Sequence, residues 1–276
     1  MDIEKWNSKI ADLHHQYISA QPFPHIAIDN FLPEQEVNQL LQEFPTTALK
    51  KGWIHYRHFN ENKHGLNATE QIPTSILGFI QFMHTQPVIE FLEKLTGIEN
   101  LLPDISLEGA GIHLSERGGY LNMHADFSTH PRFNHLQRRL NILLYLNKNW
   151  KDEYRGDLEF WSADMKRCEK KIAPLFNRLI VFNTTEISFH GFPEPLLCPE
   201  NETRKSIALY YYTQTEKSNP VLSTKYRTRP GDGLKALPNW VDNKLLFGYT
   251  YLKRLFGMND NAASVLLGIK DWFRKK

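Results

Sequence analysis

The sequence is poor in cysteine, nearly balanced in charge and free of long apolar runs. Its two cysteines, Cys168 and Cys198, cannot build a disulfide framework and fit no zinc-binding spacing. A net charge of +2 on 276 residues argues neither for nor against an anionic partner. Without a helix-turn-helix or RNA-binding signature, no nucleic-acid partner is predicted. The charged N-terminus is unlike a signal peptide, and no stretch reaches the ~20 apolar residues of a membrane span. We therefore expect a soluble protein of the reducing cytoplasm.

Apolar spacing divides the chain into three predicted parts. Residues 1–104 show helical spacing around one strand-like stretch and form an N-terminal buttress of the same domain. Residues 105–214 hold many short apolar or alternating runs bounded by turn residues, which is the pattern of a β-sandwich or barrel. Residues 215–276 form a basic, aromatic-rich helical extension. Helices followed by strands indicate an α+β fold in which helices buttress a β-roll.

Two segments outside the strand-rich part carry predictions of their own. Residues 46–72 are polar and contain Gly52 and Gly65, so we expect a long loop or lid there. From Lys225 to the C-terminus the chain holds eleven Lys/Arg against four Asp/Glu. The apolar residues of this basic tail are predicted to pack on the roll, to form a homodimer contact, or to touch an anionic membrane surface peripherally.

A metal site is indicated by His124, Asp126 and His190. Residues at i and i+2 of a strand point to the same face, so His124 and Asp126 can bind one ion from one side. Alone the H-x-D pattern is a weak signal, because twelve histidines make a chance occurrence easy. His190 follows a predicted strand sixty-four positions after Asp126 and is the best third ligand. Two histidines and one carboxylate with open positions are the ligand set of non-haem Fe(II) oxygenases.

A second candidate group begins at Arg204. This arginine opens a hydrophobic strand, and Ser206 shares its face. A guanidinium makes two parallel hydrogen bonds to a carboxylate and a hydroxyl can add a third, which suits a dicarboxylic acid bound next to the metal. Lys205 is the fallback anchor, although its side chain points to the opposite face.

With these motifs the sequence resembles the prolyl 4-hydroxylase-like branch of the Fe(II)/2-oxoglutarate-dependent oxygenases. The stretch from Tyr145 to Trp150, YLNKNW, is similar to a segment of the oxygen-sensing prolyl hydroxylases. The resemblance implies that Tyr145 binds the far carboxylate of 2-oxoglutarate, and Asn141 and Leu143 share its strand face and line the same pocket. GDLEFW resembles the family's GG-x-L strand, with Asp157 in place of the second glycine. The implied fold is a double-stranded β-helix (jelly roll).

The resemblance also implies an activity. Family members convert 2-oxoglutarate and O2 to succinate and CO2 with Fe(II), some with ascorbate as a reductant, and hydroxylate an unactivated C–H bond. Because Asp126 keeps the carboxylate that halogenases of the superfamily lack, we expect hydroxylation. The substrate is either a prolyl or other residue of a peptide or protein, or a small molecule such as an amino acid, natural product or glycan precursor.

Four residues are candidates for contact with substrate: His130, Arg138, Arg139 and Trp161. The first three follow the H-x-D strand, where a solvated loop is the competing interpretation. Trp161 lies near the predicted mouth of the roll. Two other function classes stay open. One is a non-catalytic β-roll binding module with a vestigial site, and the other is a cupin-like or JmjC-type metalloprotein.

Overall fold

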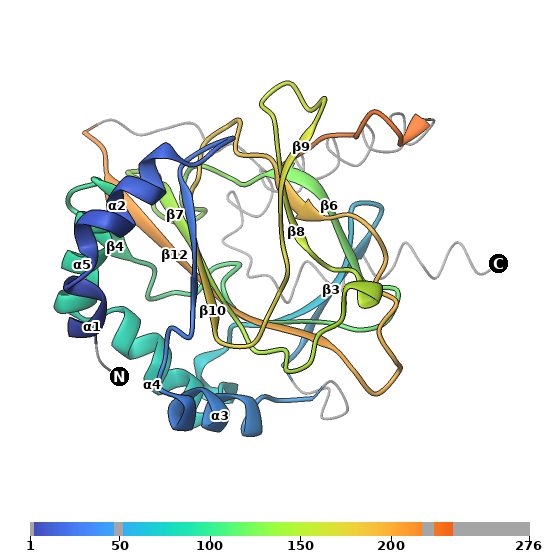
Figure 1. Cartoon of the computed structure of the whole chain (residues 1–276), viewed down its shortest axis with the longest axis horizontal. Coiled ribbons are helices and arrows are strands. Elements are labelled where there is room, and N and C mark those ends of the chain that lie inside the picture. Colours follow the sequence, from blue (N-terminus) through green and yellow to red (C-terminus); the bar gives the residue numbers. More distant parts are fainter. Residues whose placement is uncertain (1–2, 47–51, 217–223, 234–276) are drawn as a thin grey trace.

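One antiparallel sheet, curled into a nearly closed roll, dominates the computed structural model (Figure 1). The structure describes residues 3–46, 52–216 and 224–233. Its strands are β1 (His25–Asp29), β2 (Ile54–His58), β3 (Glu61–Leu66), β4 (Leu102–Pro103), β5 (Gly111–Ser115), β6 (Tyr120–Ala125), β7 (Leu136–Tyr145), β8 (Leu158–Trp161), β9 (Cys168–Ile172), β10 (Arg178–Asn183), β11 (His190–Phe192), β12 (Arg204–Gln214) and β13 (Lys225–Tyr226). Their order is β1-β10-β7-β12-β5-β3-β6-β11-β8-β9, with β2 on β3, β4 on β12 and β13 on β6.

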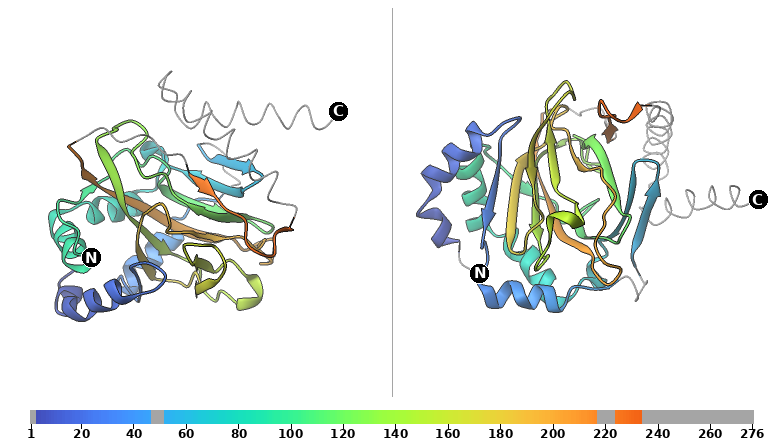
Figure 2. Two further views of the ribbon diagram at one scale, coloured as in Figure 1. Left: turned by 90° about the horizontal axis from the view of Figure 1, so that it is seen from above. Right: turned by 45° about the vertical axis from the view of Figure 1, so that its right-hand side comes forward.

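The α-helices of the described residues all precede the strand-rich part and cover one face of the roll (Figures 1 and 2). They are α1 (Glu4–Asn7), α2 (Ile10–Ser19), α3 (Glu34–Gln42), α4 (Thr74–Met83) and α5 (Gln86–Thr96). Pro87 stands in the first turn of α5, where its missing N–H costs nothing. Gly97 ends α5 in the left-handed conformation that glycine adopts without strain.

Alternation along the central strands places the core and the interior of the roll on opposite faces. In β7, Leu140, Ile142 and Leu144 belong to the large core beneath the helices. Their neighbours Asn141, Leu143 and Tyr145 line a cavity inside the roll. A strand buried on both faces turns successive side chains into different layers, so one sequence stretch supplies both stability and the site.

The predicted α+β fold, a β-roll buttressed by N-terminal helices, is confirmed. The prediction of a long loop at 46–72 is wrong, because β2 and β3 form a hairpin within it. β3 also pairs with β5 and β6. The sequence did not predict β3 because its residues, ENKHGL, show no alternation of apolar and polar side chains. Pairing with the neighbouring strands, rather than its own sequence pattern, makes this segment a strand.

The three-part division of the chain stays a prediction. Residues 234–276, which include the predicted C-terminal helices, lie outside the described residues. Within the described ranges no helix is both long and apolar enough to cross a lipid bilayer.

Candidate metal and co-substrate site

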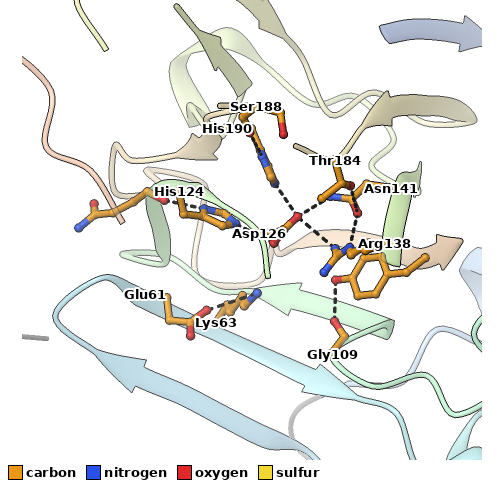
Figure 3. A network of polar contacts seen from close by, with 12 residues as sticks. Glu61, Lys63, Gly109, His124, Asp126, Arg138, Asn141, Thr184, Ser188 and His190 are labelled. Atoms are coloured by element: carbon orange, nitrogen blue, oxygen red, sulfur yellow. Dashed lines mark hydrogen bonds and ion pairs between the residues drawn. The ribbon is translucent and has the colours of Figure 1, made fainter. Parts of the chain in front are cut away.

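The structure brings His124, Asp126 and His190 together inside the roll (Figure 3). Antiparallel pairing of β6 with β11 sets His124 directly opposite His190, and their ring centroids lie 4.4 Å apart. The Nε2 atoms of His124 and His190 each lie 3.4 Å from a different carboxylate oxygen of Asp126. The three donor atoms fall within 4.8 Å of one another. This is a compact set of two imidazole nitrogens and one carboxylate, and it fits a single Fe(II) ion.

Backbone contacts orient both imidazoles. Nδ1 of His124 lies 2.9 Å from the carbonyl oxygen of Asn122, and Nδ1 of His190 lies 2.9 Å from that of Ser188. A ring that donates through Nδ1 keeps the lone pair of Nε2 for a metal. Burial, together with the nearby His124, lowers the pKa of His190 to about 3. His190 is therefore neutral at neutral pH, as a ligand must be.

Asp126 is held by an arginine and an amide. Its Oδ2 accepts hydrogen bonds from Nη2 of Arg138 at 3.1 Å and from Nδ2 of Asn141 at 2.6 Å. Burial would raise the pKa of Asp126, but Arg138 and the two histidines outweigh it and hold the pKa well below its usual range. Arg138 is 1% exposed and stacks over the Tyr210 ring at 3.3 Å. It thus holds the carboxylate of the candidate site, a contact that sequence reasoning missed.

Arg204 is a buried cation at the start of β12. Its Nε donates to the carbonyl oxygen of Gly156 at 2.8 Å, and its Nη2 donates to the Tyr145 hydroxyl at 3.0 Å. The guanidinium also packs over the rings of Tyr145 and Phe192, at 4.8 and 4.2 Å. Gly156 has a φ of +84°, and a Cβ there would lie 3.2 Å from the Arg204 side chain. Glycine at this position therefore lets the backbone carbonyl approach and hold the guanidinium.

One cavity joins the metal donors to Arg204. The cavity has a volume of about 600 Å³ and is partly open to solvent. The predicted residues Asn141, Leu143, Tyr145 and Ser206 all line it. The remaining lining residues are Lys63, His113, Ser115, Leu121, Leu158, Phe182, Phe192 and Tyr210. A dicarboxylic acid that reaches from the triad to Arg204 therefore has a partly apolar channel to occupy.

Sequence reasoning missed two basic residues of this cavity. Lys63 reaches it from the β2–β3 hairpin and lies 3.3 Å from the buried carboxylate of Glu61. His113 projects from β5, and burial lowers the pKa of His113 to about 3. Period two along GIHLS was the available signal, because His113 and Ser115 alternate with the core residues Ile112 and Leu114.

None of the four residues predicted to contact substrate lines this cavity. His130 is 1% exposed, and its Nδ1 accepts hydrogen bonds from two backbone N–H groups of its own loop. Arg139 donates to the Thr213 hydroxyl at 3.4 Å and does not line the cavity. Trp161 donates to Glu159 and packs in a separate cluster. The structure does not bring His130, Arg139 or Trp161 to the site.

Comparison with known proteins finds sequence similarity to one protein family. Residues 110–212 match the model of the 2OG-Fe(II) oxygenase superfamily. Prolyl 3-hydroxylase OGFOD1 of Mus musculus is 26% identical over 216 residues, which are 76% of this chain and 36% of that protein. The chain thus spans about a third of the length of this curated relative.

Solved structures agree in fold. A Trichoplax adhaerens prolyl hydroxylase, in complex with a peptide fragment of a hypoxia inducible factor, has a TM-score of 0.55 and 16% identity, over 77% of this chain and 94% of that one. A Pseudomonas putida prolyl-4-hydroxylase has a TM-score of 0.53 and 17% identity, over 75% and 100%. SnoN, an epimerase from nogalamycin biosynthesis, has a TM-score of 0.53 and 13% identity, over 82% and 90%. The predicted double-stranded β-helix is confirmed.

Proposed function

Since the chain belongs to the 2OG-Fe(II) oxygenase superfamily through residues 110–212, we propose that it is a hydroxylase whose iron ligands are His124, Asp126 and His190. The observation that carries this proposal is the cavity that the triad shares with the buried Arg204. The far carboxylate of 2-oxoglutarate pairs with the Arg204 guanidinium, and Tyr145 and Ser206 supply hydroxyls beside it. Bound Fe(II) supplies the activation of O2 that couples conversion of 2-oxoglutarate to succinate and CO2 with hydroxylation of a C–H bond.

The side chains of the protein orient the carboxylates of Asp126 and of the co-substrate, and they exclude water. Arg138 and Asn141 engage Oδ2 of Asp126, which leaves Oδ1 for the metal. Burial raises the pKa of Tyr145, only partly opposed by Arg204, so its hydroxyl stays protonated as a donor to carboxylate. Leu143, Leu158 and other apolar side chains line the cavity and keep the reacting groups out of bulk water.

For the prime substrate we propose a prolyl residue in a peptide or protein. The support is that the curated relative aligned over most of this chain is a prolyl 3-hydroxylase. Ascorbate is proposed as the reductant that maintains Fe(II).

The test is succinate formation from 2-oxoglutarate with Fe(II) and ascorbate, measured against matched panels of prolyl peptides, non-prolyl peptides and free small molecules. Stimulation by prolyl peptides alone supports the proposal, whereas stimulation by small molecules alone moves the substrate to that class. Thermal unfolding with Mn(II) and 2-oxoglutarate distinguishes an intact site from a vestigial one, because a ligand bound only by the folded state must raise the midpoint. No rise with either ligand would favour a non-catalytic binding module.

A further inference from the structure

A short C-terminal segment crosses the metal-binding end of β6. We call residues 224–233 the strap. Its strand β13 pairs antiparallel with β6, placing Lys225 opposite Ala125 and Tyr226 opposite His124. The N–H of Arg227 donates to the carbonyl oxygen of Met123 at 2.9 Å. Because β11 also pairs with β6 at His124, this ligand sits on a strand paired along both edges, by β11 and by the strap.

The strap forms backbone hydrogen bonds with the part of the β6 edge that the β2–β3 hairpin does not cover. β3 pairs with β6 only at Tyr120 and Leu121, and the N–H of Asn122 donates to the carbonyl oxygen of Asn60 at 2.8 Å. Beyond that point Met123 and Ala125 are each 1% exposed, so their backbone polar groups need partners within the protein. The strap supplies them at the residues that flank His124.

Tyr226 fills the space between the hairpin and the metal ligand. Tyr226 is 4% exposed. Its ring lies 5.4 Å from the His124 ring at an interplanar angle of 37°, and 5.9 Å from the His58 ring at 83°. In the left view of Figure 2 the orange strap runs beside the blue hairpin. His124 is thus held through Nδ1 by its own backbone and against its ring by Tyr226.

An ion pair fastens the strap to the segment that follows the second histidine ligand. Nη1 of Arg229 lies 2.7 Å from Oε1 of Glu194, and Glu194 follows the end of β11 by two positions. Asp232 accepts from the backbone N–H of Arg229 at 2.7 Å and from its Nη2 at 3.1 Å. The strap therefore contacts β6 by backbone pairing and the segment after β11 through this charge pair.

We propose that Tyr226 is a positioning residue for His124 and that the Arg229–Glu194 pair holds Tyr226 in place. The inference rests on the proposed iron site. Loss of the ring removes one of the contacts that hold the His124 imidazole and leaves the Nδ1 contact with Asn122. Loss of a contact that supports a metal ligand typically lowers metal affinity by about 10- to 100-fold. Arg229 and Glu194 are partly exposed, so their pair contributes less, on the order of two- to fivefold.

The experiment is a calorimetric titration of Mn(II) into the full chain in the presence of 2-oxoglutarate, without turnover. Tyr226→Ala is expected to weaken Mn(II) binding about tenfold. Tyr226→Phe keeps the ring and is expected to bind as the wild type does. Arg229→Ala is expected to weaken binding a few-fold, and Arg229→Lys to restore it. Arg167→Ala is the matched control, because it removes an exposed Arg–Glu pair at 2.9 Å that does not line the cavity.

Two further measurements make the outcomes decisive. The affinity of the Mn(II)-saturated protein for 2-oxoglutarate should not change in Tyr226→Ala, since Tyr226 does not line the cavity that contains Arg204. General loosening of the fold would lower both affinities and would overturn the positioning role. Wild-type Mn(II) affinity in Tyr226→Ala also overturns that role and leaves the proposed function standing. Failure of the wild type to bind Mn(II) overturns the proposed function as well. Should Tyr226→Ala not fold, the Arg229→Ala and Arg229→Lys pair decides the question.

Discussion

Truncation of Arg204 to alanine is predicted to remove most of the affinity for 2-oxoglutarate and little of the affinity for the metal. The guanidinium is 6% exposed and is already held by Gly156 and Tyr145, so it is preorganised to meet a carboxylate. Its donors are separate from the triad, which is anchored instead by Arg138 and Asn141.

The magnitude follows from the burial. A hydrogen bond to a charged group contributes about 1.5–3 kcal/mol, and leaving one member of a buried ion pair without its partner costs about 3–5 kcal/mol. At about 1.4 kcal/mol for each factor of ten, the dissociation constant of 2-oxoglutarate should rise by roughly two to three orders of magnitude. Arg204→Lys should fall between, because an ammonium keeps the charge but loses the planar fork.

The assay is a titration of 2-oxoglutarate into Mn(II)-loaded protein without O2. Lys205→Ala is the matched control, because this neighbouring cation donates to the carbonyl oxygen of Thr203 at 3.1 Å and does not line the cavity. Unchanged affinity in Arg204→Ala, with a loss in Lys205→Ala, would refute the reasoning and make Lys205 the anchor. A loss of Mn(II) binding in Arg204→Ala would show that the two groups are not independent.

Three further predictions concern the triad and its surroundings. His124→Ala and Asp126→Ala should each abolish turnover of 2-oxoglutarate, measured as succinate; residual turnover at the wild-type rate would remove them from the ligand set. Arg138→Met should lower the free energy of unfolding of the metal-free protein by about 3 kcal/mol in urea titrations, because it leaves Asp126 as an uncompensated buried charge. Acid should destabilise the metal-free protein below pH 6.5, because His113 and His190, with pKa values of about 3, take up protons there only when unfolded. Each contributes a slope of up to about 1.4 kcal/mol per pH unit, present until the pH falls to the folded pKa, and His113→Gln should remove one such contribution.

Period two carried most of what the sequence could predict about the site. It predicted that Asn141, Leu143 and Tyr145 share one face of β7. It also predicted that Arg204 and Ser206 share one face of β12, and all five residues line the cavity. This works because strands buried on both faces have no freedom to slip by one residue without exchanging layers. His190 lies too far along the chain for any local pattern, so its place beside His124 follows from the pairing of β6 with β11.

What the sequence could not predict depends on contacts between distant segments. His130 is predicted to contact substrate, with a solvated loop as the alternative, yet it is buried and lies 3.5 Å from the carboxylate of Asp104, a buried residue before β5. Arg138 is two positions from Leu140, so period two predicts that it faces the core with Leu140. The irregular register of β7 with β12 between Tyr211 and Tyr212 instead lets Arg138 contact Asn141 and Asp126. Tyr226 lies in a turn-rich stretch, where the edge of β6 rather than local propensity fixes a strand.

For the proposed metal site, the separation of the two histidine-bearing strands also governs when the nascent chain can capture an ion. Asp126 leaves the ribosome sixty-four positions before His190, so it and His124 are a two-donor fragment during that interval. A third donor joins them only after β11 has been synthesised and paired, and β13 follows later still. Iron supply should therefore determine how much finished polypeptide is loaded, and should have little influence on the early steps of its folding.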